Sequence, residues 1–214
     1  MKPISRTCVV VASLVMAGGS LACGEDATPT RPTQAANRAT PSGGDAEATF
    51  AVGPDLAAVR AATAKFHDIT EAYPAGYTIE FEPCVAVPGL GAMGIHARNE
   101  PLMEDQVIDP LRPELLLYAP RSNGGYRLIG VEYFVAVLLR DPVTNEVDTW
   151  KSAEPWPSTY QVVTPTPQLF GHTFDGPMPG HIPTMPWHWD MHAWIWAHNP
   201  SGMFAEWNPT VQCE

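Results

Sequence analysis

The sequence predicts an α+β fold, in which one N-terminal helix packs on a mainly antiparallel β-sheet or partly closed barrel within a single loop-rich domain. One helical stripe of apolar residues is followed by several short strand-like runs, without the alternation of strands and helices that gives a parallel sheet. The 23 prolines and 17 glycines among 214 residues keep regular elements short. Hydrophobic residues make up 45% of the chain, which suffices for one sizeable core.

The first 22 residues follow the order of a secretory signal peptide, with two basic residues, an apolar run at residues 9–16 and small residues before the cleavage site. The sequence GSLAC at residues 19–23 resembles a bacterial lipoprotein processing box, which predicts that Cys23 becomes the lipidated N-terminus. The same residues fit ordinary signal cleavage, so plain secretion is the alternative. We therefore expect an exported protein, either a membrane-anchored lipoprotein of the cell envelope or a periplasmic or secreted protein.

Residues 23–49 predict a disordered tether, because residues 24–49 include no Val, Ile, Leu, Met or aromatic residue that could enter a core. The globular domain then covers residues 50–214. The net charge is −11 and the basic residues form no cluster, which excludes nucleic acid as a partner. No apolar run reaches about 18 residues, so the expected contact with a membrane is the lipid anchor.

A helix is predicted from Leu56 to Ala72, with Asp55 as its N-cap. Pro74 and Gly76 end it. Its apolar residues recur at spacings of three and four and form one stripe: Leu56, Val59, Ala62, Phe66, Ile69 and Tyr73.

Strands are predicted by apolar, β-branched and aromatic runs at residues 77–87, 115–118, 126–139, 160–163 and 187–196. The sequence Asn123-Gly124-Gly125 joins the second run to the third, which predicts a hairpin. Residues 141–186 are otherwise rich in Pro and Gly and predict loops. The sequence GLGAMG at residues 89–94 matches a dinucleotide fingerprint, but residues 95–101, which follow it, do not favour a helix, so it predicts a flexible turn that presents His96.

Cys84 and Cys213 are the cysteines of the predicted domain, and an exported chain usually pairs such thiols. We expect a disulfide that joins the C-terminus to the middle of the chain. Two independent free thiols are the alternative.

Histidines and one carboxylate predict a metal site. His188 and His192 lie four residues apart, so both share one face of the predicted strand with Asp190. Glu132 lies inside an apolar strand, where a carboxylate is costly to bury unless it is paired or bound to a cation. The candidate ligands are His96, Glu132, His188 and His192, with His181 as a fifth. Such a set suits a divalent transition metal such as Zn, Cu, Ni or non-haem Fe.

Each of these residues has a structural alternative. Glu132 could form an ion pair with Arg127, Arg140 or Lys65, and any single histidine could be hydrogen-bonded or exposed. His67 and His198 are expected to be non-ligands. Four methionines near the histidines could be thioether ligands or core residues: Met178, Met185, Met191 and Met203. Five tryptophans could form the core or an aromatic platform for a glycan or planar compound: Trp187, Trp189, Trp194, Trp196 and Trp207.

Several motifs resemble those of a group of exported bacterial proteins that have no assigned activity. These motifs are GAMGIH at residues 91–96, PELLLY at 113–118, VEY at 131–133, MPWHWDMHAW at 185–194 and NPSGMF at 199–204. The resemblance implies export and covers most of residues 55–213, but it implies no mechanism.

Three functions fit these observations. The first is a metal-binding protein of the cell envelope. The second is a metal-dependent enzyme with an open coordination position, in which Asp190 or His181 would act as general base. The third is a lipoprotein without a metal, whose aromatic surface contacts a small molecule or another envelope protein.

Overall fold

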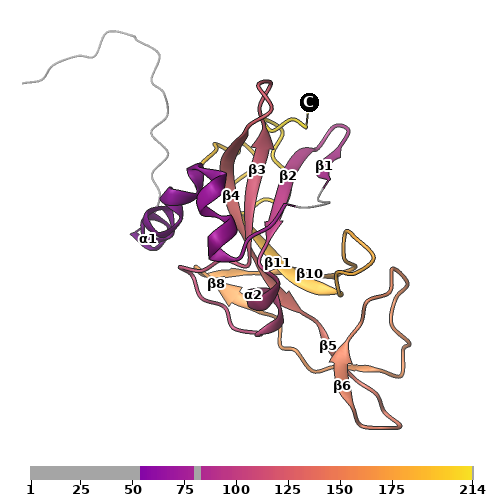
Figure 1. Ribbon diagram of the computed structural model, residues 1–214. Helices are drawn as coiled ribbons and strands as arrows, with labels where there is room; N and C mark the ends of the chain where they lie inside the picture. Colours follow the sequence, from indigo (N-terminus) through magenta and orange to yellow (C-terminus); the bar gives the residue numbers. More distant parts are fainter. Residues whose placement is uncertain (1–53, 80–82, 214) are drawn as a thin grey trace, which may run out of the picture. The chain divides into compact units, whose positions relative to one another are not determined.

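The computed structural model describes residues 54–79 and 83–213, and its centre is a six-stranded sheet (Figure 1). The predicted signal peptide, Cys23 and the predicted tether lie outside the described residues. Every pair of neighbouring strands in this sheet is antiparallel. In spatial order the strands are β1 (Cys84–Val87), β2 (Gly91–Arg98), β3 (Leu115–Pro120), β4 (Tyr126–Ala136), β11 (His188–Ala193) and β10 (Asp175–Met178). The predicted α+β class with a mainly antiparallel sheet is confirmed.

Shorter elements surround this sheet. β5 (Leu138–Arg140), β6 (Val147–Thr149) and β7 (Gln161–Val162) form a second sheet, β8 (Gln168–Leu169) pairs with β9 (His172–Thr173), and α2 (Glu100–Glu104) follows β2. In Figure 1, β5 and β6 extend away from the main sheet. No helix among the residues that the structure describes has the length and apolar character needed to cross a bilayer.

The helical segment is more broken than the sequence predicts. It consists of α1 (Pro54–Thr63) and three 3₁₀ turns, η1 (Ala64–His67), η2 (Ile69–Glu71) and η3 (Tyr73–Ala75). The prediction of one helix to residue 72 is wrong, because local side chains compete for the backbone. The Thr63 hydroxyl donates to the Val59 carbonyl at 2.8 Å, and the Asp68 carboxylate accepts from the Thr70 amide and starts a new turn.

Two further details of that prediction need correction. The helix begins at Pro54, so Asp55 lies in its first turn rather than at the N-cap. In the first turn, its negative charge still interacts favourably with the positive end of the helix dipole. Tyr73 is 47% exposed and therefore does not belong to the buried stripe.

This helical segment covers one face of the main sheet (Figure 1). Val59 and Phe66 pack in the same buried cluster as Tyr118 of β3 and Val131 of β4. The Tyr118 hydroxyl donates to the Phe66 carbonyl at 2.8 Å, which ties the first 3₁₀ turn to the sheet. From β11, this face receives Trp189, Met191 and Ala193, as the alternation along the predicted strand requires.

The opposite face of the sheet carries two smaller apolar clusters. One includes Leu117, Ile129 and Trp194, and the other includes Phe134 and Met185. Along β4, residue 132 lies between Ile129 of the first cluster and Phe134 of the second. A polar site therefore lies between two apolar clusters on this face.

The predicted strands agree with the structure except near residues 77–98. The prediction of loops over residues 141–186 is wrong in part, because β6, β8, β9 and β10 lie in this range and β10 belongs to the main sheet. β3 and β4 form the predicted hairpin, and β7 and β11 lie within the predicted runs at 160–163 and 187–196. The run at 126–139 divides into β4 and β5 at Val137, whose amide donates to the Trp187 carbonyl. In the run at 77–87, the described residues contain only an isolated bridge at Thr78 and the strand β1.

The prediction of a flexible turn at residues 89–94 is wrong for residues 91–94, because residues 91–98 form β2, an inner strand of the sheet, and the turn is limited to residues 88–90. Gly94 has a φ of +95°, and a Cβ atom there would lie 2.5 Å from the Tyr118 carbonyl oxygen. The glycine therefore permits a close approach of two strands. His96 consequently lies on a buried strand.

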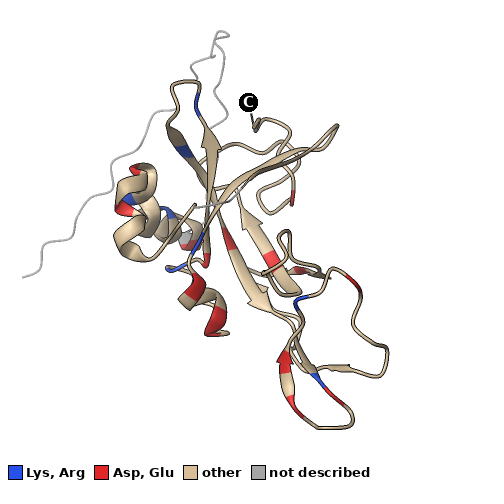
Figure 2. Ribbon diagram, turned by 45° about the vertical axis from the view of Figure 1, so that its right-hand side comes forward, with Lys and Arg blue, Asp and Glu red and all other residues tan. Residues whose placement is uncertain are grey.

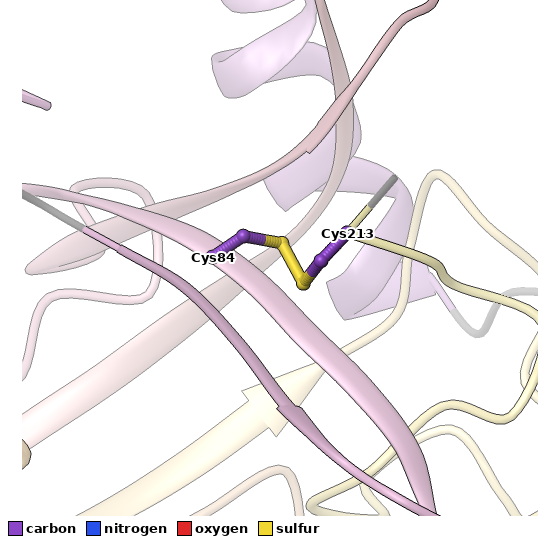
Figure 3. Close-up of a disulfide and its surroundings, with 2 residues drawn as sticks. All are labelled: Cys84 and Cys213. Carbon is purple, nitrogen blue, oxygen red and sulfur yellow. A yellow bond between two sulfur atoms is a disulfide. The ribbon is translucent and has the colours of Figure 1, made fainter.

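A disulfide joins Cys84 of β1 to Cys213, with 5.5 Å between the Cα atoms (Figure 3). The two cysteines are 129 residues apart in the sequence. The predicted disulfide is confirmed, and it fixes the C-terminal segment against the edge of the main sheet.

Candidate metal centre

β11 and β4 supply the base of the candidate site. His188, Asp190 and His192 alternate along β11 and are all buried. The residue paired with His192 across the ladder is Glu132 of β4. Figure 2 shows acidic residues on helices and loops and also on strands. Glu132 and Asp190 lie in β4 and β11, and both are buried.

His96 reaches the same place from β2. Its Nε2 atom lies 3.2 Å from Glu132 Oε2, and that oxygen lies 3.7 Å from His192 Nε2. The ring centres of His96 and His192 are 6.0 Å apart. Three strand spacings separate β2 from β11, about 14 Å in a flat sheet. The sheet therefore curls around this face, which brings side chains from distant strands together.

His181 lies at the solvent side of the cluster. Its ring centre is 5.9 Å from that of His96 and 5.9 Å from that of His188. Unlike the other members it is exposed, and it belongs to the Pro-rich loop between β10 and β11. A pocket of about 440 Å³ lies beside it, lined also by Lys151 and Ile182. All five predicted ligand residues thus lie in one cluster.

Burial keeps the imidazoles neutral. Removal from water lowers the pKa of His188 to about 4 and that of His192 to about 3, and it holds the pKa of His96 well below its ordinary value. The neighbouring histidines lower the pKa of His96 and His192 further. Neutral imidazole is the form that binds metal ions.

Burial has the opposite effect on Asp190. It raises the pKa of this carboxyl group to about 8, and the acidic neighbours Asp175 and Glu206 raise it further. Both carboxyl oxygens are buried, and within the described part of the chain neither has a hydrogen-bond partner. Such a group carries a free-energy cost that a bound cation would remove.

The cluster contains two overlapping sets of ligand atoms that could hold a metal ion. The first set is His96, Glu132 and His192, and the second is Glu132, His188 and Asp190. Within each set, one ligand atom per residue lies within 4.8 Å of the others. Asp190 is thus a candidate ligand, although the sequence predicts it only as a neighbour or a general base. Its position two residues from both histidines was the available signal.

The other three histidines, which include the two expected to be non-ligands, lie elsewhere. The His67 ring stacks edge-on against Trp196, with 4.3 Å between ring centres. The His198 side chain is exposed, and its backbone carbonyl accepts from Asn208. His172 is exposed on β9.

The tryptophans and methionines mainly serve the core. Trp189 and Trp194 are buried, the other three tryptophans of this region are half-buried, and Met185 and Met191 lie inside apolar clusters. The Trp194 indole donates to the Ala205 carbonyl at 2.6 Å, which satisfies its polar atom inside the core. These contacts favour core packing over an aromatic platform.

A further buried carboxyl group was missed in the sequence. Glu114, just before β3, is 1% exposed, and its Oε2 accepts from the Phe134 amide at 3.1 Å. Burial raises its pKa to about 8. Its neighbours in sequence, a proline and an apolar strand, give no sign of this environment.

Comparison with known proteins adds no family to this description. The chain matches no protein-family model, no curated protein and no solved structure. The chemistry of the cluster is therefore the basis for assigning a function.

Proposed function

We propose that this domain binds a divalent transition metal ion through His96, Glu132 and His192. The observation that carries the proposal is the convergence of two neutral imidazoles and a carboxylate at one buried point. An ion with bonds of 2.0–2.2 Å holds its ligand atoms about 3.3–3.6 Å apart in tetrahedral geometry. The distances of 3.2 Å and 3.7 Å to Glu132 Oε2 are close to this separation.

The spacing of the rings supports the same interpretation. A metal ion bound by an imidazole nitrogen lies about 3 Å from the ring centre, so two rings that share an ion have centres about 5–6 Å apart. His96 lies 6.0 Å from His192 and 5.9 Å from His181 by this measure. His181 can therefore join the ion from the solvent side, or leave a position open for water.

A purely structural role explains these residues less well. The Nε2 atoms of His96 and His192 are buried, and neither makes a hydrogen bond with a described residue. Burying polar atoms without hydrogen bonds costs about 1–3 kcal/mol for each group. Binding of a cation removes this cost for both nitrogens together.

The first prediction concerns metal affinity. Metal-free protein should bind Zn²⁺, Co²⁺ or Ni²⁺ in equilibrium dialysis, and the double substitution of His96 and His192 by Ala should lower affinity for the first ion at least 100-fold. His172→Ala is the matched control, because that histidine is exposed and outside the cluster. Equal binding by the double variant and the control would contradict the proposal.

We also propose that the metal is bound in the bacterial cell envelope. The supporting observations are the signal-like first 22 residues, the GSLAC sequence at 19–23 and the resemblance to exported bacterial proteins. The disulfide agrees with an oxidising compartment.

The second prediction tests this location. Cys23→Ser should move the protein from the membrane fraction to the soluble envelope fraction, because the substitution removes the acceptor of the lipid. Immunoblotting of separated fractions measures the change. Cys8→Ser, within the predicted signal peptide, serves as the control for loss of a cysteine. Unchanged membrane association of the Cys23 variant would instead indicate another attachment.

A further inference from the structure

His188 has a buried nitrogen lone pair to which the first ion does not bind. Its Nδ1 lies 3.0 Å from the Pro186 carbonyl oxygen. A carbonyl can only accept, so Nδ1 carries the hydrogen and Nε2 carries a lone pair. Stacking on Phe134, at 4.6 Å between ring centres, holds the ring in this orientation. The Nε2 atom is buried and finds no hydrogen-bond donor among the described residues.

Asp190 faces this lone pair. Its Oδ2 lies 3.9 Å from His188 Nε2 and 3.9 Å from His192 Nδ1. Both separations are too long for hydrogen bonds. The distance to His188 Nε2 is a few tenths of an ångström longer than that of two atoms on one ion, so a small movement of the side chains would let Asp190 and His188 share an ion. The side chain is fully buried, and both of its oxygens lack hydrogen bonds within the described residues. An ion held by His96, Glu132 and His192 would leave Asp190 and His188 in this state.

We infer that the domain binds a second divalent transition metal ion, held by His188 and Asp190 and bridged to the first ion by Glu132. This inference rests on the proposed function. Of the five buried residues, His96 and His192 belong only to the first ligand set, His188 and Asp190 only to the second, and Glu132 to both. A carboxylate shared in this way is typical of two-metal sites, whose ions lie about 3.5–4 Å apart.

One alternative uses a single ion. Asp190 would then accept a hydrogen bond from His192 Nδ1 and orient that ligand, as carboxylates often do around metal sites. This arrangement explains Asp190 but leaves the His188 lone pair buried without a partner. A second ion provides a partner for both residues.

The position of His181 also fits two ions. Its ring lies 5.9 Å from His96, a ligand of the first ion, and 5.9 Å from His188, a ligand of the second. It therefore lies on the solvent side, between the proposed positions of the two ions.

Native mass spectrometry of the metal-free protein, titrated with Zn²⁺, counts the ions directly. We expect two ions per chain, and one ion with His188→Ala. Asp190→Asn, which preserves shape, should weaken the second ion at least 10-fold and retain the first. His172→Ala should bind two ions, and circular dichroism establishes that each variant is folded.

The outcomes separate the two proposals. No bound ion in the wild-type protein would overturn both. One ion, with unchanged affinity in His188→Ala and Asp190→Asn, would overturn the second ion and leave the proposed function standing. Co²⁺-loaded protein gives an independent measurement, because two Co²⁺ ions bridged by a carboxylate couple magnetically and isolated Co²⁺ does not.

Discussion

At the scale of single residues, the unusual feature of the molecule is that several ionisable side chains are buried. Glu114 resembles Asp190 in burial but differs in its surroundings, because it accepts a hydrogen bond from the Phe134 amide. It therefore has a structural partner, whereas Asp190 faces histidines. Glu114 is accordingly a residue of the core rather than of the candidate site.

The third prediction follows from the raised pKa of Glu114. The unfolded chain loses this proton near the ordinary value of 4.5, and the folded protein loses it near 8. Between these values the unfolded state holds fewer protons, so the free energy of unfolding falls as pH rises. Glu114→Gln keeps an acceptor oxygen for the Phe134 amide and does not titrate.

Thermal unfolding of the metal-free protein from pH 5 to pH 8 measures this effect. The stability of Glu114→Gln relative to the wild type should rise across this range by about 2–4 kcal/mol. Parallel curves for the two proteins would show that Glu114 does not hold its proton in the folded state.

At the scale of elements, the sequence predicts those strands whose own residues show a turn sequence or a clear alternation. The β3–β4 hairpin has a glycine-containing turn between apolar runs, and β11 has clear alternation. β2 could not be predicted, because its glycines resemble turn residues. Gly91 approaches the Asn208 carbonyl and Gly94 the Tyr118 carbonyl, and both contacts depend on segments that are distant in the sequence.

The fourth prediction tests this role of Gly94. Gly94→Ala places a Cβ atom 2.5 Å from the Tyr118 carbonyl oxygen, whereas Gly124→Ala meets nothing within 4 Å. Both residues have positive φ, so both substitutions add about 1–2 kcal/mol of backbone strain. Gly94→Ala should cost at least about 2 kcal/mol more than the control.

Denaturant unfolding of the two glycine variants measures the difference. Gly94→Ala should also weaken binding of the first ion, because His96 is two residues further along the same strand. Equal stability of the two variants would contradict the close contact between β2 and β3.

At the scale of the whole molecule, the candidate site depends on how the sheet curls. The sequence identified His96, Glu132, His181, His188 and His192 by residue type and alternation, yet their common location arises from β2, β4, β11 and one loop together. Curvature is a property of the complete sheet and its packing, so it cannot be predicted from the spacing of residues along the chain. The disulfide holds one edge of this sheet to the C-terminal segment.

The fifth prediction concerns this disulfide. Replacing both Cys84 and Cys213 by Ser should lower the free energy of unfolding by up to about 5 kcal/mol, because the bridge restricts a long loop in the unfolded state. Denaturant unfolding of oxidised wild type and the double variant measures it. Reduced wild type should behave like the variant, and a change below about 1 kcal/mol would mean that the bridge adds little.

The distribution of the proposed ligands along the chain determines when they could take up a metal ion. His96 and His192 are 96 positions apart, and Glu132 lies between them in the sequence. An unfolded chain offers these groups as isolated, weak donors, and they meet only after β2, β3, β4 and β11 have paired. If the chain is exported unfolded, as proposed, it arrives without the proposed ion and acquires it from the surroundings in which it folds. The metal found in the purified protein would then record the ion supply of that compartment rather than of the cytoplasm.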